Sequence, residues 1–121
     1  MKINSYKDLI VRQRAVDLSV EIYKVTKKFP KEELYGLTSQ MRRASVSIPS
    51  NIAEGRNRGT RNDFAQYLRI ALGSGAELET QLEISRRLDF VDTIDTQKIA
   101  SSLEEIMKML NAIINKLKAD S

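Results

Sequence analysis

Six arginines in residues 40–70 are the side chains of this sequence that are best suited to binding phosphate. The stretch holds only two acidic residues, so its formal charge is +4, equal to that of the whole chain. Guanidinium groups bind phosphate oxygens through charge-assisted hydrogen bonds that are often paired. These candidate nucleic-acid-binding residues are Arg42, Arg43, Arg56, Arg58, Arg61 and Arg69.

Three of the arginines lie in a connection that contains glycine and leads to a helix N-terminus: Arg56, Arg58 and Arg61. Backbone amides and the helix dipole favour anions at such a position. No aromatic residues are interleaved with them, so a nucleic acid would be contacted through its phosphates with weak sequence preference. A solvated basic surface without a ligand is the alternative interpretation.

Residues for catalysis or metal binding are scarce. The sequence contains no histidine and no cysteine, which removes the commonest general base, the commonest metal ligand and every thiolate. A solvated helix face is the favoured interpretation of three carboxylates, Glu77, Glu79 and Glu83. Glu83 can also form ion pairs with the arginines three and four residues later. We therefore predict no catalytic residue, no metal and no cofactor, and an enzyme is the least favoured class of function.

A proline interrupts the apolar pattern within "SVSIPSNIAEG", residues 45–55. Because Ile48 and Ile52 stay roughly in phase on one helical face, we expect one helix that is kinked near Pro49. The alternative is that Pro49 begins a new helical turn. In a kinked helix, serine hydroxyls would help to satisfy the freed backbone groups, and the candidates are Ser45, Ser47 and Ser50.

Two further polar residues and two glycines stand out. Asn51 and Glu54 lie beside the apolar face of the same helix, where a structural polar network is favoured over catalysis. Gly73 and Gly75 are expected within a later helix, where each costs about 1 kcal/mol relative to alanine. Close approach of a neighbouring helix would compensate, and we expect it at Ala71, Gly75 and Ala76.

Four segments carry apolar residues at every third or fourth position, the spacing of amphipathic helices. We expect the first helix to end at Pro30. We expect Thr60 with Asp63 to cap the start of the third helix, and Asp92 or Asp95 to cap the start of the fourth. The faces expected to be buried are Val11, Ala15, Leu18, Ile22, Val25 and Phe29; Leu34, Leu37, Met41, Ala44, Ile48 and Ile52; Phe64, Leu68, Ala71, Gly75, Leu78, Leu82 and Ser85; and Ile99, Leu103, Ile106, Leu110, Ile113 and Leu117.

These segments predict an all-α protein, an antiparallel up-down-up-down four-helix bundle that forms one domain over residues 1–121. Apolar residues outside the main faces, such as Val16, Val20 and Tyr23, favour self-association. The sequence has no secretory signal and no apolar run of about 20 residues. A cytoplasmic location without membrane contact is therefore expected.

The two stretches "YGLTSQMRRASVSIPSNIAEGRNRG" and "FAQYLRIALGSGAELETQLEISRRL" resemble a bacterial family of four-helix bundles, the proteins encoded in intervening sequences of 23S ribosomal RNA genes. The resemblance covers nearly the whole chain. Its most specific block is residues 47–55, with Ser47, Pro49, Asn51, Glu54 and Gly55 as the structural signature.

The resemblance implies an antiparallel bundle that assembles as a ring-like homopentamer. It also implies similarity to the accessory protein of diversity-generating retroelements, which engages RNA and a reverse transcriptase through basic surfaces. It offers no catalytic residues to transfer. The leading hypothesis is a non-enzymatic oligomer that binds RNA or another nucleic acid through phosphate; the alternative is an interaction scaffold or accessory subunit, with a protein partner and no nucleic-acid binding.

Overall fold

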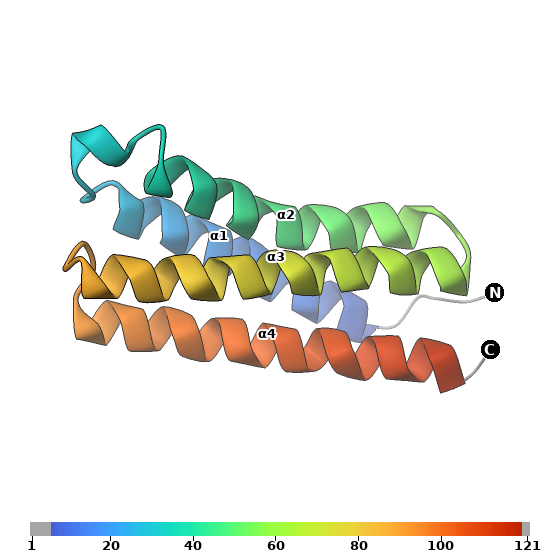
Figure 1. Ribbon diagram of the computed structural model, residues 1–121. Helices are drawn as coiled ribbons and strands as arrows, with labels where there is room; N and C mark the ends of the chain where they lie inside the picture. Colours follow the sequence, from blue (N-terminus) through green and yellow to red (C-terminus); the bar gives the residue numbers. More distant parts are fainter. Residues whose placement is uncertain (1–5, 120–121) are drawn as a thin grey trace.

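Four long helices in antiparallel order make up residues 6–119, the part of the chain that this computed structural model describes. Each helix packs against its two neighbours in an up-down-up-down bundle (Figure 1), so the predicted class and topology are confirmed. The elements are α1 (Tyr6–Thr26), a short 3-10 turn η1 (Lys31–Glu33), α2 (Leu37–Asn57), α3 (Arg61–Arg87) and α4 (Thr93–Ala119).

The starts of α3 and α4 are set by side-chain caps. The Thr60 hydroxyl accepts a hydrogen bond from the backbone N–H of Asp63 at 3.1 Å, as predicted. The Asp92 carboxylate accepts one from the N–H of Asp95 at 2.7 Å, so Asp92, not Asp95, is the cap. Such caps satisfy backbone donors that the first helical turn leaves free.

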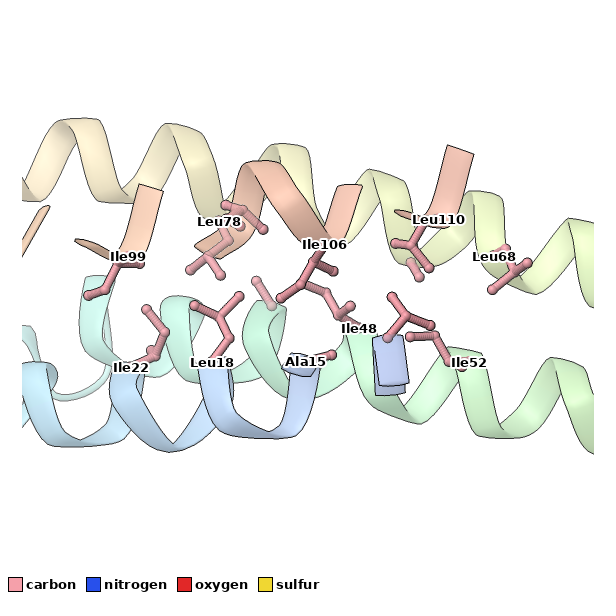
Figure 2. Packing of buried hydrophobic residues seen from close by; sticks show 14 of the residues in the cluster. Ala15, Leu18, Ile22, Ile48, Ile52, Leu68, Leu78, Ile99, Ile106 and Leu110 are labelled. Atoms are coloured by element: carbon pink, nitrogen blue, oxygen red, sulfur yellow. The ribbon is translucent and has the colours of Figure 1, made fainter. Parts of the chain in front are cut away.

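The predicted apolar faces meet in the core. Every residue of the first and third faces is buried. In Figure 2, Leu18 and Ile22 of α1 and Ile48 and Ile52 of α2 point into the interior that is also filled by Ile106 of α4. Burial of one such aliphatic side chain contributes about 1.5–3 kcal/mol, so this core is the main source of stability.

Four residues depart from these expectations. Leu37, the first residue of α2, is half-buried. Leu34 is 48% exposed because it lies between η1 and α2, before the helical face begins. Ile113 is half-buried and Ile114 is buried in its place, since a straight helix drifts by roughly 20° per heptad from a strict seven-residue repeat. Ala76 is exposed on α3, so close helix approach does not occur there.

Pro49 lies inside α2, which continues unbroken to Asn57. The axis of α2 changes direction near its middle (Figure 1), in agreement with the predicted kink. Because proline has no N–H, the carbonyl oxygen of Ser45 loses its helical partner. The hydroxyl of Ser19 on α1 donates to that oxygen at 2.8 Å. The sequence predicts that a serine hydroxyl of α2 itself bonds to the freed carbonyl, and this prediction is wrong. The Ser45 hydroxyl donates to the carbonyl of Arg42 instead.

We predict that Ser19→Ala lowers the free energy of unfolding by about 1–3 kcal/mol, because it leaves the buried Ser45 carbonyl without a donor. In a Pro49→Ala background residue 49 regains its N–H, and the same Ser19→Ala change is expected to cost distinctly less. A double-mutant cycle by urea unfolding measures this coupling. Ser50→Ala, at an exposed hydroxyl of α2, is the control. Equal costs of Ser19→Ala in both backgrounds would refute the role of Ser19.

Candidate nucleic-acid interface

The six candidate arginines do not form one surface. Arg56, Arg58 and Arg61 lie around the short connection between α2 and α3. Arg42 and Arg43 lie in the first two turns of α2, toward the opposite end of the bundle, and Arg69 lies two turns into α3. The bundle therefore separates the candidates into one group of three and three single positions.

The connection between α2 and α3 shares an end of the bundle with the start of α1 and the end of α4 (Figure 1, right). Residues 6–9, 54–63 and 115–119 hold three acidic residues and six basic ones. We call these six the basic end: Lys7, Arg56, Arg58, Arg61, Lys116 and Lys118. Sequence reasoning did not assign the three lysines, although the antiparallel helix order places them beside the arginines.

Arg58 is held in one orientation by its neighbours. Its Nε donates to Glu54 at 3.0 Å and its Nη2 donates to the hydroxyl of Tyr67 at 2.6 Å. The guanidinium also lies 5.1 Å from the centre of the Tyr67 ring, within the range of a cation–π contact. The carboxylate of Glu54 offsets part of this charge, so Arg58 presents a fixed but weakened cation.

The start of α3 is poorly suited to bind an anion through its backbone. The N–H of Asp63 is already bonded to Thr60, and the carboxylate of Asp63 lies in the first turn, where it would repel phosphate. The sequence-based expectation included such a contact from the backbone. In this structure, side chains and not backbone amides would contact phosphate at the basic end.

The other three arginines differ from one another. Arg42 is half-buried against α1: its Nε donates to the Thr26 hydroxyl at 2.9 Å, and its guanidinium lies 4.7 Å from the centre of the Tyr23 ring. Arg43 and Arg69 are exposed. Arg42 therefore joins α1 to α2, and only Arg43 and Arg69 of these three point mainly to solvent.

Three of the five signature residues, Ser47, Asn51 and Gly55, serve the contact between α2 and α3. The Asn51 amide donates to the carbonyl and to the hydroxyl of Ser47, at 2.8 and 2.9 Å, and the Ser74 hydroxyl on α3 donates to that same hydroxyl at 2.7 Å. The predicted polar network is thus present for Asn51. Glu54 lies outside it, exposed and paired with Arg58.

Gly55 allows a close approach of these two helices. A Cβ atom on Gly55 would lie 2.6 Å from the Cβ of Tyr67 and 3.3 Å from the backbone oxygen of Phe64. Gly75 meets only the flexible side chain of Met107, at 3.1 Å or more. The signature is therefore structural, and it positions the α2–α3 connection that carries the arginines.

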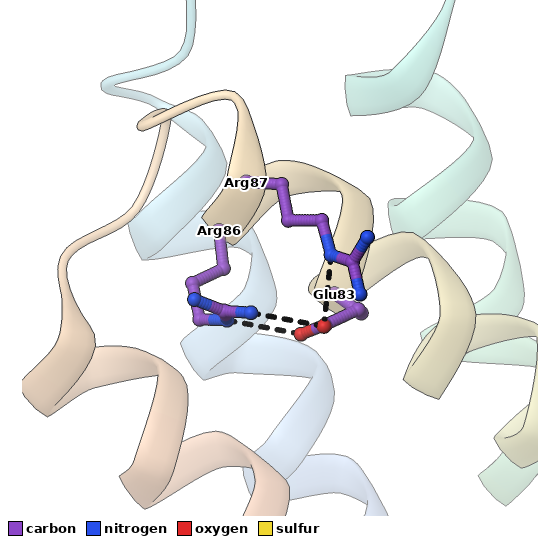
Figure 3. Close-up of polar contacts among 3 residues, drawn as sticks. All are labelled: Glu83, Arg86 and Arg87. Carbon is purple, nitrogen blue, oxygen red and sulfur yellow. Dashed lines mark hydrogen bonds and ion pairs between the residues drawn. The ribbon is translucent and has the colours of Figure 1, made fainter.

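One carboxylate of α3, that of Glu83, forms ion pairs near the surface. Arg86 donates twice to Glu83 at 2.9 Å, and Nε of Arg87 donates to it at 3.1 Å (Figure 3). These bonds, chiefly those from Arg86, lower the pKa of Glu83 from 4.5 to about 2. The pairing expected from the sequence is confirmed. Among residues 6–119, no three carboxylates gather in a way that could hold a metal ion.

The lowered pKa of Glu83 predicts a specific acid response. The stabilising effect of these bonds is complete above the ordinary pKa of 4.5 and is lost as the pH falls through about 2. An NMR titration of the Glu83 carboxyl carbon should give the low midpoint, and Arg86→Gln should raise it. Arg69→Gln, on the same helix, should leave it unchanged. A midpoint near 4.5 in the wild-type protein would contradict the ion pairs.

Comparison with known proteins places the chain in one family and finds similar solved structures. The family of 23S rRNA-intervening sequence proteins matches residues 7–112. A crystal structure of a protein of unknown function from the S23 ribosomal protein family of Bacteroides thetaiotaomicron is similar, with a TM-score of 0.83 and 30% identity. The alignment covers 90% of this chain and 98% of that one. No curated protein sequence matches. In the described part of the chain, no helix has the length and apolar character needed to cross a membrane.

Proposed function

We propose that this chain, which belongs to the family of 23S rRNA-intervening sequence proteins, is a non-enzymatic cytoplasmic protein that assembles with copies of itself and binds RNA through phosphate. The observation that carries the proposal is the basic end of the bundle. There, side chains from α1, α2, α3 and α4 place six cations around three acidic residues.

Phosphate binding is supported by the chemistry of this end. Lysine and arginine side chains that replace condensed counterions on a nucleic acid gain affinity by releasing those ions. Arg58 covers the ring of Tyr67, so this aromatic face is already in contact with a side chain. These residues therefore support binding through contacts to the RNA backbone, with little recognition of base sequence.

Self-assembly would multiply these contacts. The family resemblance implies a homopentamer, and five chains of +4 each carry +20. Each subunit would add its own basic end to the ring, and linked weak sites bind with an avidity that exceeds the affinity of one site. Binding by the assembly should therefore be strong at low salt and fall steeply as salt is added.

Filter binding of the wild-type protein to a structured RNA over a salt series tests this proposal. If about six phosphates are contacted, the association constant should fall by roughly 10³ between 50 and 200 mM salt. No binding at 50 mM salt, or binding that is independent of salt, would overturn it.

The alternative is a scaffold that binds only protein. It is favoured by exposed apolar side chains on α1 and α3, among them Val16, Val20, Ile70 and Ile84. An oligomer that dissociates at high salt and has no affinity for RNA at low salt would select this alternative.

A further inference from the structure

Helix α1 carries a second apolar stripe on the side that faces away from the core. Leu9, Val16, Val20 and Tyr23 are each 40–47% exposed, and with Gln13 and Lys27 they follow a spacing of four and three residues. A helix that is apolar on two sides normally has both sides covered. One side of α1 packs into this bundle. On the other side Arg42 covers part of the Tyr23 ring, and the apolar side chains of the stripe remain 40–47% exposed.

This stripe borders a groove between α1 and α2. The groove has a volume of about 520 Å³ and is lined mainly by apolar atoms of Val16, Val20, Tyr23, Val46 and Pro49. Lys24 and Lys27 also line it, and Arg42 lies against the ring of Tyr23. We call this surface the groove face; it is apolar at the centre and basic at the rim.

Helix α3 carries an exposed apolar stripe with one carboxylate at its centre. Ile70 and Ile84 are each 45% exposed and Leu88 is 53% exposed. Glu77 is exposed and lies midway between the two isoleucines, seven residues from each. Residues at this spacing share one side of a helix. We call this surface the α3 face; it is apolar with an acidic centre.

We propose that the groove face of one copy of this chain binds the α3 face of a second copy. This inference specifies the self-association within the proposed function and rests on it. The charges select the pairing: two groove faces would bring Lys24, Lys27 and Arg42 of both copies together, and two α3 faces would oppose their Glu77 carboxylates. A contact between the groove face of one copy and the α3 face of another brings opposite charges together around apolar centres.

The contact joins copies head to tail, because the two faces differ from each other. The two faces belong to α1 with α2 and to α3, and α2 packs against both α1 and α3 (Figure 1). Head-to-tail contacts build a ring if the rotation between successive copies closes, and a filament if it does not. The homopentamer of the proposed function requires the closed form.

Two variants that each block one face test the pairing. Val16→Glu with Val20→Glu blocks the groove face, and Ile70→Lys with Ile84→Lys blocks the α3 face. Light scattering should show a closed oligomer for the wild-type protein and single chains for each variant. A mixture of the two variants should form a one-to-one dimer and nothing larger, since each variant keeps the one face that the other needs.

Several results would overturn the pairing: a monomeric wild-type protein, a blocked variant that still assembles, or a mixture that stays monomeric. Ile94→Glu, at a 78% exposed residue of α4, is the control and should assemble like the wild type. Circular dichroism verifies that the variants are folded.

A charge exchange provides a second test that keeps the apolar contacts. Glu77→Lys should weaken assembly, and adding Lys24→Glu and Lys27→Glu to the same chain should restore it; failure of the restoration would count against the pairing. RNA binding is measured separately on all these proteins. A monomer that binds RNA would refute the pairing alone, while an assembled ring without RNA affinity would refute only RNA binding.

Discussion

Neutralising the basic end is expected to lower RNA affinity by about 60-fold or more. The variant replaces four side chains by glutamine: Arg56, Arg61, Lys116 and Lys118. At 0.1 M salt each lost phosphate contact lowers the association constant roughly eightfold, because one counterion is no longer released. If two of the four contact phosphate, the expected loss is about 60-fold, and if all four do, it is several thousand-fold. Filter binding at fixed salt measures it.

A variant with the same change in net charge at the other end of the bundle is the matched control. It replaces four exposed residues by glutamine: Lys28, Lys31, Arg86 and Arg87. Its RNA affinity should stay within a few-fold of the wild-type value. An equal loss in both variants would mean that net charge, and not the basic end, determines binding. Unchanged affinity in the first variant would refute the basic end as the binding surface.

Gly55→Ala is expected to lower the stability of the protein, although alanine is a better helix former than glycine. The new methyl group would lie 2.6 Å from the Cβ of Tyr67 and 3.3 Å from the backbone oxygen of Phe64. Neither atom can move without a shift of α3. Such overpacking costs about 1–3 kcal/mol and occasionally more, which exceeds the gain of about 1 kcal/mol from helix propensity. Thermal unfolding measures the net loss.

Gly73→Ala is the matched control for this substitution. Gly73 is an exposed helical residue, and nothing lies within 4 Å of the position that its Cβ would take. The same chemical change should therefore raise stability by up to about 1 kcal/mol. If Gly55→Ala were as stable as Gly73→Ala, the close contact between α2 and α3 would not exist in solution.

The helices and their buried faces were predictable because they depend on local spacing. The first face, from Val11 on α1 to Phe29 just after it, and the face from Phe64 to Ser85 on α3 follow three- and four-residue steps. Every residue expected on these two faces is buried. The caps at Thr60 and Asp92 were predictable for the same reason, since a cap and its partner are three residues apart. Leu34 and Ile113 were misassigned where a stripe runs past a helix start or drifts around a helix.

Contacts between helices could not be predicted from local patterns. The bond from Ser19 to the Ser45 carbonyl joins residues 26 positions apart and depends on the register of α1 against α2. The same register places Arg42 on Tyr23. Gly55 resembles an ordinary helix end in sequence, and only the approach of Tyr67 shows why it lacks a side chain.

The candidate interface was partly predictable. The cluster of arginines in residues 56–61 was visible as a local excess of charge. Lys7, Lys116 and Lys118 join it only because an up-down-up-down bundle returns the start of α1 and the end of α4 to that end (Figure 1). Conversely, Arg42 counted toward the charge excess, but in the structure it joins two helices.

Protection of lysines from acetylation by bound RNA tests the location of binding most directly, because lysines lie at both ends of the bundle. Mass spectrometry of the wild-type protein, acetylated with and without a structured RNA, reports each lysine separately. We predict protection of Lys7, Lys116 and Lys118, and unchanged reactivity of Lys28, Lys31 and Lys98. Protection confined to the second group, or equal protection of all six, would contradict binding at the basic end.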